Sequence, residues 1–150
     1  MKLFPYITSA LAALCLLVSC QSKLEENRLY EESDFVAPVL VSPESINLTE
    51  ATLANEDAKV TFTWKKADFG QPAEILYNLN ASYNGKAVVL LAGLSGESRE
   101  VGAAELGDKL INLGIPHGQT VNVTFSIDCS FGTDFISLKS ADKSVSVYVY

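Results

Sequence analysis

One cysteine near the amino terminus carries the clearest chemical signal in the sequence. Cys20 directly follows the small residue Ser19 and the apolar pair Leu17-Val18. A signal peptidase needs a small residue to fit its cleft, and the thiol of the next residue accepts a diacylglycerol group. The order apolar, small, cysteine is typical of a bacterial lipobox. It predicts cleavage between Ser19 and Cys20 and lipidation of Cys20.

The residues before Cys20 supply the other parts of such a signal. Lys2 gives a positive start, and the apolar run from Ile7 to Val18 is shorter than a membrane-spanning helix. We therefore expect residues 1–19 to be a lipoprotein signal peptide. The alternatives are an ordinary secretory signal or a hydrophobic helix with a chance cysteine, but the position and order of the residues favour lipidation.

The other reactive side chains form no catalytic or metal-binding pattern. His117 is the single histidine and lies in a Pro-His-Gly turn, and Gly93–Gly96 reads as a turn that lacks the spacing of a nucleophile elbow. Cys129 lies on the apolar side of its strand, which favours a buried, unreactive thiol. The acidic residues show no glycosidase pair. We expect no catalytic residues, no cofactor, no metal and no enzymatic activity.

Exposed aromatic side chains can bind sugars by stacking against the sugar rings. Trp64 alternates in step with apolar neighbours, as do Tyr77 and Tyr83, so these three rings are expected in the core. Tyr148 and Tyr150 fall on the serine side of the last strand and are expected to be more exposed. They are the only candidates for a glycan-binding pair.

Charge and cysteine content restrict the partners and the means of stabilisation. The full chain carries a net charge of −7, and removal of Lys2 with the signal leaves ten basic and eighteen acidic residues. This balance argues against nucleic acid as a partner and against attraction to anionic lipid by charge. Once Cys20 is acylated, Cys129 is the only thiol left, so the folded domain must depend on its core rather than on an internal disulfide.

Residues 20–35 are predicted to be an acidic flexible tether. They contain five acidic residues, few apolar ones and no sustained strand period, and such a segment buries too little apolar surface to offset its chain entropy. The segment is either a plain spacer or a routing signal. Glu25 and Glu26 resemble the acidic residues that direct some bacterial lipoproteins to the outer cell face.

From Val36 onward, apolar and polar residues alternate with the period of two that is typical of half-buried strands. The alternation is clearest over 60–64, 77–83, 121–129 and 145–149, and weaker strands are expected at 39–42, 46–49, 87–91 and 98–101. Asn84-Gly85 predicts a tight hairpin, and the leucine spacing within Ala103–Leu113, followed by Gly114, predicts a short helix. Residues 36–150 are therefore predicted to form an all-β, immunoglobulin-like sandwich of seven or eight strands with one short helical crossover.

A family resemblance rests on four segments of this domain: Ala37–Leu40, Val60–Gly70, Ile75–Leu79 and Ala104–Gly114 before a long strand. They resemble the amino-terminal domain of SusE-type outer-membrane lipoproteins over nearly all of residues 36–150. The resemblance implies a starch-utilisation type system, with a surface lipoprotein near an outer-membrane transporter. In that family the sugar-binding aromatics belong to domains that follow this one. The sequence ends at Tyr150, so no glycan-contacting residue is carried over.

Three functional hypotheses follow, from different classes. The first is a lipid-anchored outer-membrane protein, facing outward, that helps a starch-like polysaccharide to bind and enter the cell without catalysis. The second is a structural spacer or docking domain that binds a transporter complex through a sheet edge or loop and binds no glycan itself. The third, a periplasm-facing enzyme, is disfavoured by the missing catalytic pattern.

Overall fold

The structure is a computed structural model that describes residues 34–70, 72, 74–131 and 136–150. The predicted signal peptide, the tether as far as residue 33 and the lipidation site Cys20 lie outside these residues. Residues Asp34–Tyr150 form one compact unit. This unit includes Phe35, the last residue of the expected tether, whose ring packs edge-on against Phe69 with centroids 5.3 Å apart. The next residue, Val36, exchanges two backbone hydrogen bonds with Asp68.

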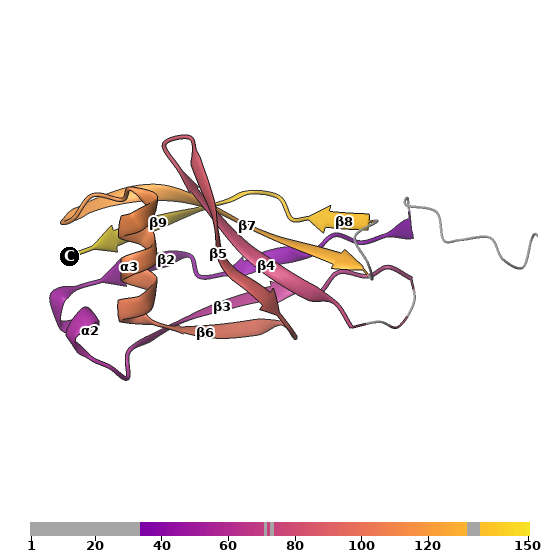
Figure 1. The fold of residues 1–150 in the computed structure, drawn as a ribbon, viewed down its shortest axis with the longest axis horizontal. Helices are drawn as coiled ribbons and strands as arrows, with labels where there is room; N and C mark the ends of the chain where they lie inside the picture. The colour runs from indigo at the N-terminus through magenta and orange to yellow at the C-terminus, as the bar shows by residue number, and fades with distance from the viewer. Residues whose placement is uncertain (1–33, 71, 73, 132–135) are drawn as a thin grey trace, which may run out of the picture. The chain divides into compact units, whose positions relative to one another are not determined.

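Strands dominate the described chain, with two helices between them (Figure 1). In order along the sequence, the elements are β1 (Val39–Ser42), β2 (Ser45–Leu48), α2 (Glu50–Ala54), β3 (Lys59–Lys65), β4 (Leu76–Tyr83), β5 (Lys86–Leu94), β6 (Ser98–Gly102), α3 (Ala103–Leu113), β7 (Gln119–Phe131), β8 (Ile136–Lys139) and β9 (Lys143–Val149).

These strands form two sheets, so the predicted all-β sandwich is confirmed. The smaller sheet has the order β1-β3-β6, and the larger has the order β2-β9-β7-β4-β5, with β8 also paired to β7. All neighbours are antiparallel except β2 and β9. The described residues hold nine strands instead of the expected seven or eight, because four-residue β8 is too short to show a period.

Aromatic rings fill the space between the sheets. The ring centroids of Phe62 on β3 and Phe125 on β7 are 5.8 Å apart, and those of Trp64 on β3 and Tyr77 on β4 are 5.6 Å apart. All four side chains are buried, as predicted for Trp64 and Tyr77. Tyr83 only borders this core and is half-buried. The inner faces of the two sheets therefore consist mainly of apolar side chains that pack against each other.

The crossover helix α3 has the bounds that the leucine spacing predicts. Leu106, Leu110 and Leu113 are buried along one face, and Gly114 ends the helix with a left-handed φ of 111°. Gly107 lies in the helix interior, where glycine is usually unfavourable. Glycine fits here because the Cβ of any other residue would lie only 2.9 Å from the side chain of Leu53 on α2. No helix in the described ranges is long and apolar enough to cross a membrane.

The short helix α2 was not predicted from the sequence. It contains a single turn and so gives no apolar period. Its start is fixed by Thr49, whose side-chain oxygen accepts a hydrogen bond from the backbone nitrogen of Thr52 at 3.2 Å. The predicted hairpin is confirmed, since Asn84 and Gly85 connect β4 to β5 with φ values of 50° and 78°.

Leu110 provides a test of how much α3 contributes to the core. Its side chain is fully buried, so Leu110→Ala should lower the free energy of unfolding by about 2–5 kcal/mol through lost burial and a residual cavity. Urea denaturation followed by circular dichroism measures this change. The matched control is Asp108→Ala on the exposed side of the same helix, which should change stability by less than about 0.5 kcal/mol. Equal effects of the two substitutions would contradict the core role of α3.

Candidate functional site

The outer face of the larger sheet is lined by polar side chains in register across β4 and β7. Asn78 lies opposite Asp128, Asn80 opposite Ser126 and Ser82 opposite Thr124. Neighbouring positions on the same strands, such as Leu79 and Ile127, point into the core. Because side chains alternate along a strand, the packing of the inner face forces these polar groups into rows on the outer face.

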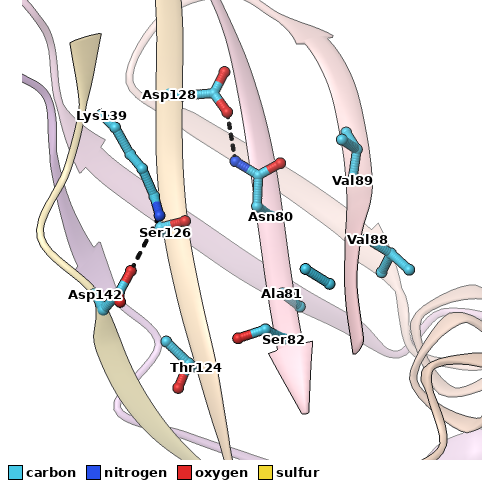
Figure 2. Close-up of a pocket in the computed structure, with 11 residues that line it drawn as sticks. Asn80, Ala81, Ser82, Val88, Val89, Thr124, Ser126, Asp128, Lys139 and Asp142 are labelled. Carbon is cyan, nitrogen blue, oxygen red and sulfur yellow. Dashed lines mark hydrogen bonds and ion pairs between the residues drawn. The ribbon is translucent and has the colours of Figure 1, made fainter. Parts of the chain in front are cut away.

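A hollow of about 360 Å³ opens on this face. Its floor comes from β4 and β7, one side from β5, and the other side from the connection between β8 and β9 (Figure 2). Asn80, Ser82, Thr124, Ser126 and Asp128 supply polar groups, while Ala87 and Val89 supply an apolar wall. The hollow therefore offers hydrogen-bonding groups beside a small apolar surface.

Two asparagines hold the Asp128 carboxylate in place. Asn78 Nδ2 donates to Asp128 Oδ1 at 3.0 Å, and Asn80 Nδ2 donates to Oδ2 at 2.6 Å. Asn78 is fixed in turn on its other side, because its Oδ1 accepts a hydrogen bond from the Gly93 backbone on β5 at 3.3 Å. Hydrogen bonds to an ionised acceptor are among the stronger ones in proteins. We call Asn78, Asn80 and Asp128 the carboxylate clamp.

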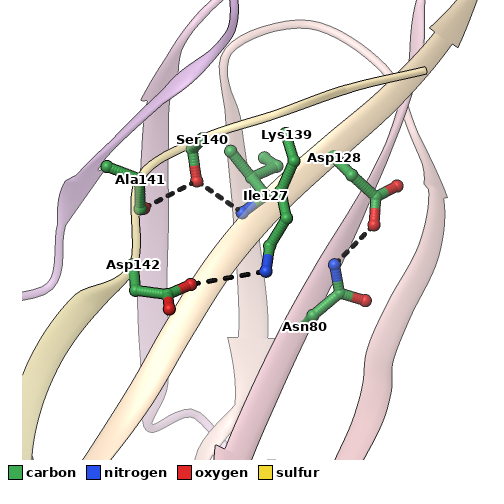
Figure 3. Close-up of polar contacts among 7 residues, drawn as sticks. All are labelled: Asn80, Ile127, Asp128, Lys139, Ser140, Ala141 and Asp142. Carbon is green, nitrogen blue, oxygen red and sulfur yellow. Dashed lines mark hydrogen bonds and ion pairs between the residues drawn. The ribbon is translucent and has the colours of Figure 1, made fainter. Parts of the chain in front are cut away.

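Ser140 holds the connection between β8 and β9, which forms one side of the hollow, against β7 (Figure 3). Strand β8 pairs with β7 from Asp128 onward and β9 pairs with β7 as far as Phe125, which leaves a gap in the ladder around Ile127. Ser140 bridges this gap: its backbone nitrogen donates to Ile127 O at 2.8 Å, and Ile127 N donates to Ser140 Oγ at 2.9 Å. The hydroxyl then donates to Ala141 O at 3.0 Å. The chain is thereby held against β7 between the two strands.

This attachment places an ion pair at the rim of the hollow. Lys139 Nζ lies 3.4 Å from Asp142 Oδ1, with both side chains more than half exposed (Figures 2 and 3). Exposed pairs of this kind contribute about 0–1 kcal/mol to stability. The pair therefore matters more for the charge at the rim than for the fold.

The candidates for catalysis lie away from the hollow or point away from it. His117 is exposed, and its Nδ1 lies 2.8 Å from the backbone oxygen of Tyr150. Cys129 is buried on the core side of β7. The predicted turn at Gly93–Gly96 is only partly found, because β5 continues to Leu94. Within the ranges that the structure describes, no group of three His, Cys, Asp or Glu residues is arranged to hold a metal ion.

Tyr148 and Tyr150 border two different hollows. Tyr148 is half-buried on the outer face of the larger sheet and lines a hollow of about 340 Å³ with Thr120 and Ser146. Tyr150 is 54% exposed and lines a separate hollow of about 250 Å³ beside α3. The two rings therefore do not share a binding surface in this structure, and glycan binding by either residue stays a prediction.

The carboxylate clamp was not predicted as a site. Its three residues were visible in the sequence only as the polar positions of alternating strands. Asn78 and Asp128 are 50 residues apart, and their pairing depends on the register between β4 and β7. One feature of the sequence could have indicated the clamp. Two asparagines and one aspartate occupy outward positions where serine or threonine would serve equally well on a surface without a binding role.

The described residues thus form a β-sandwich with an open polar hollow on the outer face of its larger sheet. The chain belongs to the SusE outer membrane protein family, whose family model matches residues 23–128. That match includes β1 to β6, α3 and β7 as far as Asp128. No curated protein and no solved structure shows significant similarity to the chain.

Membership in the family fixes the general role. The protein is an outer-membrane component of a Sus-type system. Members of the family are accessory proteins and are generally not enzymes. This agrees with the interpretation of the sequence at the level of location and system.

The buried thiol of Cys129 predicts a pH dependence of stability. Burial raises the pKa of Cys129 from 9.0 to about 11, so the neutral thiol is favoured in the folded state. The resulting stabilisation is fully present below pH 9 and is lost as the pH rises to 11, because the unfolded chain ionises first. We expect this thiol to account for a fall of about 2–3 kcal/mol in the free energy of unfolding over that range.

Urea denaturation at pH 8 to 11 in reducing buffer measures this fall. Cys129→Ala serves as the comparison, because it removes the thiol and leaves every other titrating group in place. The variant should show a shallower decline with pH than the wild type. Parallel declines would contradict the assignment to Cys129.

Proposed function

We propose that the protein is a lipid-anchored component of the outer cell face that helps to hold a starch-like polysaccharide for uptake and performs no catalysis. The match to the SusE outer membrane protein family over residues 23–128 carries this proposal. It is supported by the lipobox pattern at Cys20 and by the acidic residues that follow it. The polar hollow on the larger sheet is a candidate place for the polysaccharide.

A second candidate function is docking to a transporter complex without glycan contact. Among the described strands, β5 pairs on one side only, with β4, and so forms an edge of the larger sheet. Its Val89 side chain is 57% exposed. An open strand edge can add a strand from another protein through backbone hydrogen bonds. This edge is a candidate place for such docking, as are the other sheet edges among the described strands, β2, β1 and β6.

The lipid anchor is tested by Cys20→Ala. Because the acyl chains attach to this thiol, the variant should lose incorporation of labelled palmitate and should not reach the outer-membrane fraction. Cys15→Ala is the matched control, since Cys15 lies inside the predicted signal peptide and should leave labelling unchanged. Labelling that persists in Cys20→Ala would contradict the anchor. Protease treatment of intact cells, which should degrade the wild-type protein, tests the outward orientation.

The two candidate functions are separated by measuring glycan binding and partner binding on the same preparation. The full chain, purified in detergent, should migrate more slowly in native gels that contain amylopectin or dextran than in plain gels. A pull-down from detergent-solubilised outer membranes measures association with a transporter. If the full chain recovers a transporter while none of the glycans retards it, the docking function replaces the glycan-holding one.

A further inference from the structure

We propose that the carboxylate clamp and the hollow around it bind the hydroxyl groups of a neutral polysaccharide laid along the outer face of the larger sheet. This inference rests on the proposed function and assigns the residues that contact the polysaccharide. Asn80 and Asp128 of the carboxylate clamp line the floor of the hollow between β4 and β7, as Figure 2 shows, and Asn78 holds Asp128 from outside it.

The clamp is organised before any ligand arrives. Each Asp128 oxygen accepts one amide hydrogen bond, at 3.0 and 2.6 Å, and a carboxylate oxygen can accept a further one. No hydrogen bond within the described part of the chain uses the Oδ1 of Asn80. Two carboxylate oxygens and a nearby amide oxygen can thus accept hydrogen bonds from adjacent hydroxyls of a sugar. Because the side chains are already fixed, binding requires little further ordering of the protein.

The charge of the hollow favours a neutral ligand over an anionic one. Its charged side chains are Asp128, Asp142 and Lys139, and Lys139 is paired with Asp142. Among the described residues Asp128 forms no ion pair, although Lys139 is its neighbour across β7 and β8, and the three charges leave one net negative charge that would repel an acidic sugar. The remaining polar lining consists of hydroxyls and an amide, from Ser82, Thr124, Ser126 and Asn80.

The apolar wall fits the other side of a sugar ring. Hydroxyls extend from the edge of a pyranose, whereas its faces carry C–H groups. Ala87 and Val89 on β5 are exposed and lie opposite the polar residues of β4, in register with Ser82 and Asn80. A sugar ring in the hollow would thus turn its hydroxyls to the carboxylate clamp and its C–H face to β5.

A polymer fits this face better than a single sugar because a second hollow lies along the same strands. Tyr148 lines that hollow together with Thr120, its partner on β7. Thr120 and Asp128 are eight positions apart on one strand, about 27 Å at the usual rise per residue. Two weak contacts along one chain reinforce each other through a raised effective concentration.

Asp128→Asn tests the clamp with almost no change in shape. The new amide cannot accept hydrogen bonds from both Asn78 and Asn80, so the acceptor arrangement is lost. Affinity electrophoresis of the full chain in amylopectin and dextran gels should show a dissociation constant raised about tenfold or more. Glu100→Gln is the matched control: it makes the same carboxylate-to-amide change on the smaller sheet, at an exposed ion pair with Lys59, and should shift binding less than about twofold.

The outcomes separate this inference from the proposed function. The clamp is supported if the glycan gels retard the wild type and Glu100→Gln equally and no longer retard Asp128→Asn. Equal retention of both variants overturns the clamp but leaves glycan holding intact. Stronger binding of polygalacturonate than of the neutral glycans overturns the ligand class, and an unretained wild type overturns both proposals.

A second measurement does not depend on the folding of a variant. Addition of dextran or amylopectin fragments to ¹⁵N-labelled full chain in detergent should shift backbone amide signals at residues 78–82, 124–128 and 139–142. Signals at residues 98–102 on the smaller sheet should stay in place. Shifts confined to regions outside the larger sheet would overturn the assignment.

Discussion

Contacts between aromatic rings hold the two sheets of this domain together, and the surface chemistry depends on them. Phe62 packs on Phe125 and Trp64 on Tyr77, and each pair adds about 0.5–1.5 kcal/mol beyond the burial of its area. These contacts decide which side of β3, β4 and β7 faces the core. A shift of one residue in any of these strands would bury polar side chains and expose rings, so the register of the core also fixes the arrangement of the outer face.

The carboxylate clamp is a product of that fixed register. Asn78 and Asp128 meet because their backbone positions are opposite each other in the ladder between β4 and β7, and Asn80 reaches the second oxygen from the next outward position. The clamp needs no special loop or strained backbone. Its position is as rigid as the sheet that carries it, which is what a hydrogen-bonding site requires.

Local sequence patterns determined much of the fold. Leucines at helical spacing followed by Gly114 gave the bounds of α3, and the alternation over residues 121–129 identified the long central strand β7. The site was less accessible because it depends on contacts between distant segments. The bridge that Ser140 makes to Ile127 joins a residue after one short strand to the middle of another, and no local pattern indicates it. Short elements such as α2 and β8 carry too few residues to show a period.

The bridge that Ser140 makes between β8 and β9 determines which positions beside the hollow can be substituted freely. The chain beside β7 consists of two strands joined at this residue, and Lys139 and Asp142 flank the joint while their side chains remain exposed. Substitutions at these two rim positions change charge and shape next to the hollow without touching a buried side chain. The charge and size of these two side chains can therefore change while the packing of the sandwich beneath them stays the same.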